Sequence, residues 1–238
     1  PSKSCTSALS AALNLGTLSC RAAWNGAQIS RSLAKNQYQL DSINTWIKEL
    51  AWREFYQNAL INFPELAKGP YRKKWFHFPW QNRLDWYENW INGLTGIPII
   101  DAAMRQLKQS GWMHNRCRMI VASFLVKDLL IDWKWGEIYF MRNLVDGDLA
   151  SNNGGWQWSA SSGMDPKPMR IFNPFRQASK FDPNGIYIRK WIPELAHIST
   201  SDLLSGEIAP LERKDYPSAI ISHKDQQAIF KELYSTLI

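Results

Sequence analysis

The segment "WMHNRCRMIVASFLVKDLLIDW" (residues 112–133) decides the fold class. Its apolar residues follow a helical period and culminate in the run "MIVASFLV" (119–126), which predicts one long, mostly buried helix over 112–133. Lys127 and Asp128 follow this run directly, so it is too short to span a bilayer, and we expect no membrane partner. The segment therefore predicts a helical domain with this helix in its core.

The flanking segments show the same helical spacing. We predict helices over 42–63, capped by Asp41 or Ser42, and over 97–111, with a proline near the first turn and Gly111 as its stop. Further helices are predicted over 135–145 and within "DYPSAIISHKDQQAIFKELY" (215–234). Since no segment alternates convincingly, the predicted class is all-α, as one domain over 1–238 with long loops at 64–95 and 146–193.

The charge and cysteine content narrow the partners. A formal net charge of +7 indicates an anionic partner, with nucleic acid first, although charge alone favours the simpler alternative of a merely basic protein. Cys5, Cys20 and Cys117 lie too far apart for a disulfide framework or a metal site, which indicates a reducing compartment. We therefore expect no metal.

Several catalytic motifs are absent from the sequence. It contains no phosphate-binding P-loop, no G-x-G-x-x-G, no H-E-x-x-H, no G-x-S-x-G and no zinc-deaminase pattern. The four histidines do not cluster. Metal, P-loop and Ser-His-Asp chemistry are therefore disfavoured.

Three helical segments carry candidate ligand-binding groups. "TSALS" (6–10) places hydroxyl groups where a helix begins, which suits phosphate binding, with ordinary helix capping as the favoured alternative. Glu49, Trp52 and Arg53 share one helix face, where Glu49 and Arg53 could equally form a surface ion pair. In the third segment, Asn115, Arg118 and Met119 also share a face, and Arg118 needs a carboxylate. Asp146 and Asp148 are candidates, and a structural salt bridge is as well supported as a ligand site.

The stretch "DGDLASNNGGWQW" (146–158) is the fourth candidate. Asp146, Asp148 and Asn152 can hydrogen-bond a polar heterocycle, and Trp156 and Trp158 follow at once. The alternative is a turn followed by core aromatic residues. The chain holds 13 tryptophans, which invites a role in stacking or redox chemistry, although most should belong to the core.

Together these segments resemble the FAD-binding domain of the photolyase/cryptochrome family. "TGIPIIDAAMRQLKQSGWMHNRCRMIVASFLVKDLLIDW", "DGDLASNNGGWQWSASSG", "WIKELAWREFYQNAL" and "RIFNPFRQASKFDPNGIYIRKWIPEL" carry the resemblance, which runs from about residue 5 to 195. It covers the C-terminal half of a typical member. The N-terminal α/β domain that mainly binds an antenna pigment lies outside this chain, as does a tyrosine that contacts the flavin.

The resemblance implies an all-helical domain that binds FAD in a bent conformation, active when fully reduced. The positions that match cofactor contacts are Thr6, Ser7, Leu9, Ser10, Trp46, Arg53, Trp112, Asn115, Arg118, Asp146, Asp148 and Asn152. Asn152 matches the residue facing flavin N5, where asparagine is typical of repair enzymes. Gly154 and Gly155 are expected to let the backbone turn closely past the flavin.

The resemblance also implies a substrate, UV-damaged DNA. Enzymes for the (6-4) photoproduct carry two histidines where this chain has Asn115 and Met119, which favours the cyclobutane pyrimidine dimer and the common microbial class. The matching lesion contacts are Glu49, Trp52, Asn115, Met119 and Trp158. Arg116, Arg170 and Lys180 are candidate phosphate contacts.

A chain of tryptophans is the family's route for reducing the flavin. The matching positions are Trp156 next to the flavin, then Trp133, then Trp80 at the surface, whereas Trp135 is interpreted as structural. Glu49 and Asn115, together with these three tryptophans, form the expected catalytic set.

The resemblance leaves two other functions open. One is a cryptochrome photoreceptor, which Asn152, Glu49, Trp52 and Asn115 argue against. The other is a nucleic-acid-binding module without flavin. We expect a monomer acting on DNA in the bacterial cytoplasm, or in an organelle or nucleus if the source is eukaryotic.

Overall fold

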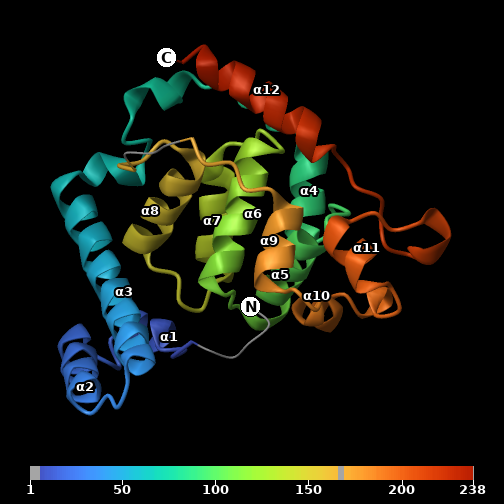
Figure 1. Ribbon diagram of the computed structural model, residues 1–238. Helices are drawn as coiled ribbons and strands as arrows, with labels where there is room; N and C mark the ends of the chain where they lie inside the picture. Colours follow the sequence, from blue (N-terminus) through green and yellow to red (C-terminus); the bar gives the residue numbers. More distant parts are fainter. Residues whose placement is uncertain (1–5, 166–168, 238) are drawn as a thin grey trace.

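Helices α5 and α6 form the centre of an all-α fold (Figure 1). The computed structural model describes residues 6–165 and 169–237, and no β-strand occurs in those ranges, which confirms the predicted class. The α-helices are α1 (Ser10–Leu15), α2 (Cys20–Ser32), α3 (Gln37–Asn62), α4 (Leu84–Asn92), α5 (Pro98–Ser110), α6 (Asn115–Lys127), α7 (Trp133–Asn143), α8 (Leu149–Ala160), α9 (Pro174–Phe181), α10 (Ile186–Trp191), α11 (Thr200–Ser205) and α12 (His223–Ser235). The 3-10 turns are η1 (Pro64–Ala67), η2 (Lys73–His77), η3 (Pro193–Leu195) and η4 (Pro210–Glu212).

Local signals define α5 as predicted. Pro98 occupies its first turn, and Gly111 ends it with a φ of 66° in the left-handed region that glycine tolerates. Buried Asp101 accepts hydrogen bonds from the backbone N–H and hydroxyl of Thr95 at 2.8 and 2.7 Å, which fixes the entry to the helix. This helix therefore follows from its own sequence.

The single helix predicted over 112–133 is wrong at both ends. It begins at Asn115, where the imidazole of His114 accepts from the backbone N–H of Arg116 at 3.0 Å, and it ends at Lys127. Leu130 then adopts a φ of 52°, and its carbonyl accepts from the Gln81 N–H at 2.8 Å. Asp132 caps the next helix, because its side chain accepts from the Lys134 N–H at 3.0 Å. Contacts distant in sequence thus divide the apolar run into α6 and α7.

Other predicted boundaries also change. Helix α3 begins before Asp41 and Ser42, because the side chain of Asn36 accepts from the Gln39 N–H at 3.0 Å and acts as the cap. The predicted loop 64–95 contains η1, η2 and α4, and the loop 146–193 contains α8, α9 and α10. Asp148 caps α8, so Asn152 and both glycines at 154 and 155 lie in a regular helix and not in a turn.

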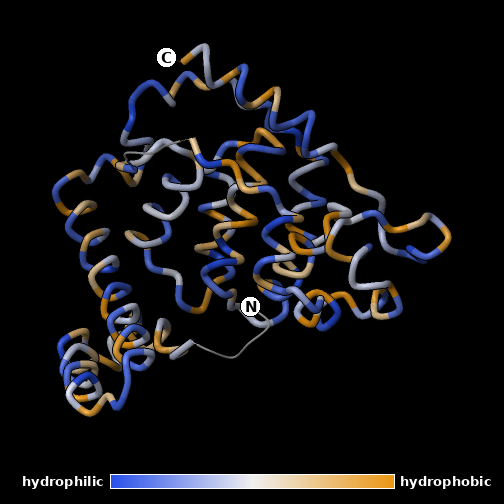
Figure 2. The backbone as a smooth tube through the Cα atoms, viewed as in Figure 1, coloured by the Kyte–Doolittle hydropathy of each residue, from blue (hydrophilic) through white to orange (hydrophobic). Residues whose placement is uncertain are grey.

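The peripheral helices surround this centre unequally. Helices α1–α3 form an arm at the left of the view, and α12 lies across the top (Figure 1). Figure 2 shows hydrophobic and hydrophilic residues interleaved along α3 and α12. A separate cluster of Trp75, Phe78, Leu130, Phe230 and Tyr234 joins α12 to the segment around η2. None of the described helices combines the length and apolar character needed to cross a membrane.

Candidate functional site

Arg118 and Asp146 form an ion pair at the edge of α6. Arg118 Nη2 lies 3.0 and 2.8 Å from the two carboxylate oxygens of Asp146, and Arg118 Nε donates to the Met113 carbonyl at 2.8 Å. The side chain of Asp146 is only 3% exposed, so each charge needs the other. The structure thus identifies Asp146, not Asp148, as the carboxylate that Arg118 requires.

Asp148 joins α8 to α3 instead. One carboxylate oxygen accepts from the Ser151 N–H at 2.8 Å, and the other accepts from Gln57 Nε2 of α3 at 2.7 Å. A carboxylate is favourable here because the N-terminus of a helix carries partial positive charge. The two predicted cofactor aspartates are therefore held by different helices, α6 and α3.

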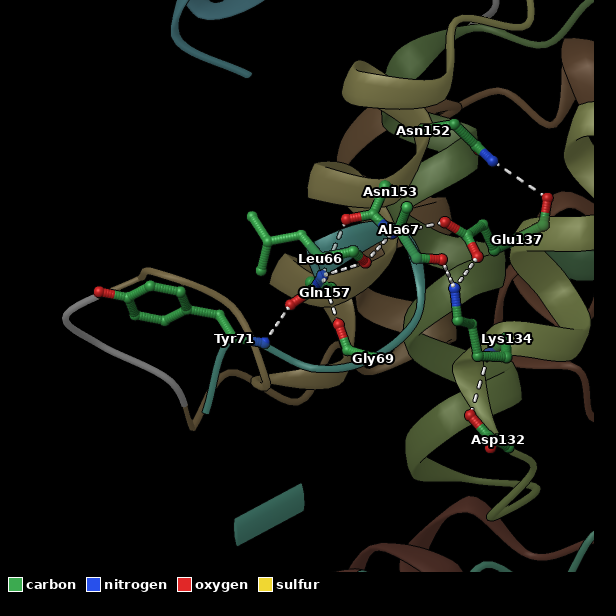
Figure 3. A network of polar contacts seen from close by, with 10 residues as sticks. All are labelled: Leu66, Ala67, Gly69, Tyr71, Asp132, Lys134, Glu137, Asn152, Asn153 and Gln157. Carbon is green, nitrogen blue, oxygen red and sulfur yellow. Dashed lines mark hydrogen bonds and ion pairs between the residues drawn. The ribbon is translucent and has the colours of Figure 1, made fainter. Parts of the chain in front are cut away.

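Asn152 is oriented by α7. Its Nδ2 donates to the Glu137 carbonyl at 3.0 Å (Figure 3). Because Nδ2 is the donor, the other end of the amide, Oδ1, is an acceptor. Among the described residues no hydrogen bond uses this oxygen, so it can accept from a bound molecule. Asn152 therefore offers an oxygen acceptor, not an N–H donor, to a ligand.

A buried polar network below Asn152 was not predicted from the sequence (Figure 3). Asn153 Nδ2 donates to Glu137 Oε1 at 2.6 Å and to the Leu66 carbonyl at 2.9 Å. Gln157 Nε2 donates to Asn153 Oδ1 at 2.8 Å, and Lys134 Nζ donates to Glu137 Oε2 at 2.7 Å. The one feature of the sequence that could have indicated this network is the spacing of Asn153 and Gln157, which are four residues apart and so share a helix face. The network fixes α8 against α7 and η1.

The N-terminal hydroxyl cluster lies beside α3. Thr6, Ser7 and Ser10 are exposed and Leu9 is half-buried. Trp46 Nε1 of α3 donates to Ser7 Oγ at 3.0 Å. Leu9 is the N-cap of α1 and makes no side-chain cap bond, so the ordinary capping alternative does not hold.

The face of α3 that carries Glu49, Trp52 and Arg53 differs in part from expectation. No ion pair joins Glu49 to Arg53 in the described part of the chain, where Arg53 Nη1 instead donates to Cys20 Sγ at 3.3 Å. Glu49 is exposed, and Trp52 is 53% exposed. Trp112, the remaining predicted cofactor contact, is half-buried before α6.

Trp52 and Trp158 line one cavity of about 470 Å³ between α3 and α8. The absence of a side chain at Gly154 lets α3 come close to α8, since a Cβ at this position would lie only 2.1 Å from the Tyr56 ring. Gly154 thus serves helix packing. The cavity wall also includes Tyr71, whereas Glu49, Asn115 and Met119 are outside its lining residues.

The three predicted phosphate-binding cations lie against aromatic rings, and only Arg170 is next to a residue of this cavity wall. The Arg170 guanidinium lies 5.4 Å from the centre of the Trp158 ring. Arg116 and Lys180 lie 4.5 and 5.5 Å from the Phe181 ring centre. Of the three predicted phosphate contacts, Arg170 therefore lies against Trp158, and Arg116 and Lys180 both lie against Phe181.

The N-terminus of α6 carries no additional positive charge from histidine at neutral pH. Burial is the main cause that lowers the pKa of His114 from 6.5 to about 4, and the nearby positive charges of Arg116 and Arg118 contribute to the same shift. Asn115 is exposed and Met119 is half-buried in the first turns of this helix.

The three matched tryptophans differ in exposure. Trp156 and Trp133 are buried, and Trp80 is half-buried. Trp156 lies against α7 where a Cβ at Gly136 would be 2.1 Å from its ring, and Gly136 is three residues from Trp133. Trp80 stacks on Trp75 with 5.9 Å between ring centres. Trp135 packs edge-on against Tyr87 at 5.1 Å, as a structural residue would.

Two observations fit a flavin beside α8. A Cβ at Gly155 would meet no described atom within 4 Å, although its neighbour Trp156 is buried. The indole N–H of Trp156 is buried without a hydrogen-bond partner among the described residues. Gly155 leaves room for a ring system, and the Trp156 N–H and the Asn152 oxygen offer it a donor and an acceptor. No group of acidic, histidine or cysteine residues in the described ranges could hold a metal.

Comparison with known proteins gives a consistent result. A family model described as the FAD binding domain of DNA photolyase matches residues 46–236. A deoxyribodipyrimidine photo-lyase from Synechococcus sp. is 57% identical over 237 residues, covering 100% of this chain and 49% of the relative. The chain spans about half the length of the curated relatives it matches.

Solved structures show the same similarity. A bacterial class III photolyase from Agrobacterium tumefaciens superposes with a TM-score of 0.92 at 40% identity, covering 100% of this chain and 50% of that one. A cryptochrome from Synechocystis sp. superposes with a TM-score of 0.88 at 32% identity, covering 96% and 48%.

Proposed function

This chain belongs to the photolyase/cryptochrome family through its FAD-binding domain, and on that premise we propose that it repairs cyclobutane pyrimidine dimers in DNA with light. The observation that carries the proposal is the cavity shared by Trp52 and Trp158, with Arg170 above one of its walls. Two indoles can enclose a flipped pyrimidine dimer, and the cation can meet the DNA backbone.

We propose that FAD binds between α3, α6 and α8. Arg118 and Asp146 would contact it as a pair, with Asp148, Trp46, Arg53, Trp112 and Asn115 around it and Thr6, Ser7, Leu9 and Ser10 at its phosphates. Reduced FAD would supply the chemistry by absorbing light and lending the dimer one electron, which returns after the cyclobutane ring has opened. The reaction then has no net redox change.

The orientation of Asn152 supports the reduced state. The bond from Nδ2 to the Glu137 carbonyl leaves Oδ1 as an acceptor. Reduced flavin carries a hydrogen on N5, whereas the oxidised form does not. Asn152 Oδ1 would therefore favour the reduced flavin, whose N5–H can donate a hydrogen bond to it.

The lesion must leave the duplex to reach this site. Extruding a base costs a few kcal/mol in enzymes that act on bases, photolyases among them, and less for damaged bases. Stacking on Trp52 and Trp158 would return about 1–3 kcal/mol per base. Glu49, Asn115 and Met119 would complete the pocket, with Glu49 and Asn115 hydrogen-bonding the pyrimidine edges and stabilising developing charge.

Three cations would hold the strand. Arg116, Arg170 and Lys180 would contact phosphates, which position DNA without reading sequence. We propose that the chain acts on UV-damaged DNA as a monomer.

The direct test is repair of a defined lesion. The chain, anaerobically reduced with FAD, would be mixed with an oligonucleotide carrying one thymine cyclobutane dimer, and restored thymines counted in blue light and in darkness. Restoration only in light supports the proposal. Flavin binding without repair would favour a photoreceptor, an alternative consistent with the similarity to a cryptochrome. Absence of flavin binding would favour a nucleic-acid-binding module.

Glu49→Ala tests the lesion pocket. We expect a lower repair yield per absorbed photon with FAD retained, because a charge-stabilising group is lost from an exposed position. Normal repair by this variant would exclude Glu49 from the pocket.

Trp80→Phe tests the electron route through Trp80, Trp133 and Trp156. We expect slower photoreduction of oxidised flavin, measured by transient absorption, with normal repair by chemically reduced protein. Unchanged photoreduction would show that electrons take another path.

A further inference from the structure

Lys127, the last residue of α6, is a buried cation with no role in the repair reaction proposed above. Its side chain is 1% exposed, and its Nζ donates to the backbone carbonyl of Arg170. The Phe230 ring of α12 lies 5.9 Å from the same nitrogen. A buried ammonium group is unfavourable unless specific contacts compensate it. The burial of Lys127 therefore needs a physical explanation.

Two acidic groups, Asp128 and Asp165, act on Lys127. Asp128 follows it in the chain and bonds to His223 of α12. The negative charge of Asp165 raises the pKa of Lys127, and its carboxylate lies 3.8 Å from Arg170 Nε. No salt bridge includes Lys127 within the described ranges, so its direct polar partner there is the Arg170 carbonyl.

One face of α6 holds the segment 169–173 at two points. Lys127 binds the carbonyl of Arg170, and Ser123 Oγ, four residues earlier on the helix, accepts from the Phe172 N–H at 3.4 Å. The Phe172 ring also packs edge-on against Trp158 with 6.1 Å between ring centres. The backbone on both sides of Ile171 is thereby held against α6, and the Phe172 side chain packs against α8.

The held segment places one cation at the cavity. The Arg170 side chain is 47% exposed, and its guanidinium stands 5.4 Å above Trp158, which lines the cavity with Trp52. Since the Arg170 backbone is tied to Lys127, the placement of the guanidinium depends on a residue that cannot itself reach DNA.

We propose that Lys127 is a positioning residue for DNA binding, which fixes the carbonyl of Arg170 against α6 and so holds the guanidinium of Arg170 over Trp158, where it meets a backbone phosphate beside the lesion. The inference rests on the proposed function. Arg170 touches the DNA, and Lys127 acts through it.

Lys127→Met tests this link, since methionine keeps much of the volume and removes the donor. Affinity for a duplex with one thymine dimer would be measured in darkness, and the repair rate at saturating DNA in light. We expect binding about tenfold weaker, the size of one cation contact, with an unchanged rate for bound substrate. Arg170→Ala should weaken binding similarly, and the double variant should lose no more than Arg170→Ala alone.

Lys108→Met is the matched control, because Lys108 is exposed on α5 and bonds to Asn92, away from the held segment. It removes the same charge and should bind almost as the native chain does. Flavin absorbance and urea unfolding would establish that each variant is folded.

The native lysine gives a second test that needs no substitution at 127. Burial lowers the Lys127 pKa from 10.5 to about 7, opposed by Asp128 and Asp165 and assisted by Arg170. Its bond to the Arg170 carbonyl therefore weakens as pH rises and the ammonium loses its charge. The affinity ratio of native chain to Arg170→Ala should fall between about pH 6 and about pH 9. Asp128, Asp165 and His223 are present in both proteins.

Three results would overturn the inference: folded Lys127→Met binding like the native chain, losses that multiply in the double variant, or a ratio independent of pH. If the native chain repairs the dimer while one of these is seen, the positioning role alone is wrong. If the native chain neither binds nor repairs the dimer, the proposed function fails first and the inference with it.

Discussion

Lys127 couples folding to pH in a direction opposite to its effect on binding. Its pKa falls from 10.5 to about 7 because of burial, so between those values the folded chain binds fewer protons than the unfolded chain. The free energy of unfolding should therefore rise with pH from about 7 towards 9, by at most about 1.4 kcal/mol per pH unit. Above pH 9 the buried thiol of Cys117, whose pKa burial raises from 9.0 to about 11, acts in the opposite direction. Burial raises the pKa of Tyr187 and Tyr216 well above 10.0, so they titrate outside this window.

Urea unfolding at a series of pH values measures this rise. Lys127→Met should abolish it, and the exposed-site variant Lys108→Met should keep it. If the free energy of unfolding of Lys127→Met rose equally with pH, a group other than Lys127 would be responsible for the change in bound protons.

Single contacts could be predicted only where both partners carry a chemical signal. The sequence shows that Arg118 needs a carboxylate, and the structure selects Asp146 from the two candidates. Lys127 and Asn152 both bond to backbone carbonyls, of Arg170 and Glu137. Every residue has such a carbonyl, so neither contact could be read from residue types.

At the scale of elements, predictions succeeded where signals are local. Helix α5 follows from Pro98 and Gly111. Helix α8 was mistaken for a loop because its asparagines and glycines have poor helix propensity. It is stabilised by distant groups: Tyr56 packs against Gly154, and Glu137 binds Asn153. The boundary after Lys127 likewise depends on a bond from Gln81 to Leu130.

The close approach of α7 and α8 makes Gly136 sensitive to substitution. Alanine normally stabilises a helix interior by about 1 kcal/mol relative to glycine. At Gly136 its Cβ would lie 2.1 Å from the Trp156 ring, and we expect Gly136→Ala to destabilise the chain by about 1–3 kcal/mol.

Gly26→Ala on α2 is the matched control, because a Cβ there meets no described atom within 4 Å. It should stabilise the chain by about 1 kcal/mol in the same urea titration. Stabilisation by both variants would mean that Trp156 does not pack against α7 as described.

At the scale of the molecule, burial is uneven. Helices α1 and α3 contain no buried residue among those described, and α2 buries only Ala23 and Ala27, whereas α5 and α6 are largely buried. The arm of α1–α3 nevertheless contributes Ser7, Trp46 and Arg53 to the proposed flavin site. Few apolar contacts imply a low free energy of local opening.

Hydrogen exchange followed by mass spectrometry should reveal this difference. Amides of α1–α3 should exchange well before those of α5 and α6 without FAD, and added FAD should slow them selectively, because a ligand stabilises the state that binds it. Equal protection of the arm and the centre without FAD would contradict this division.

The aromatic cluster beneath α12 also has an optical consequence. The indoles of Trp75 and Trp80 stack with 5.9 Å between ring centres and 24° between planes. Transition dipoles of two chromophores this close couple, and the pair contributes exciton bands to the far-ultraviolet circular dichroism spectrum where helices also absorb. A helix content fitted from that spectrum would be biased, and the bias would decrease in Trp75→Phe while the helices stayed folded.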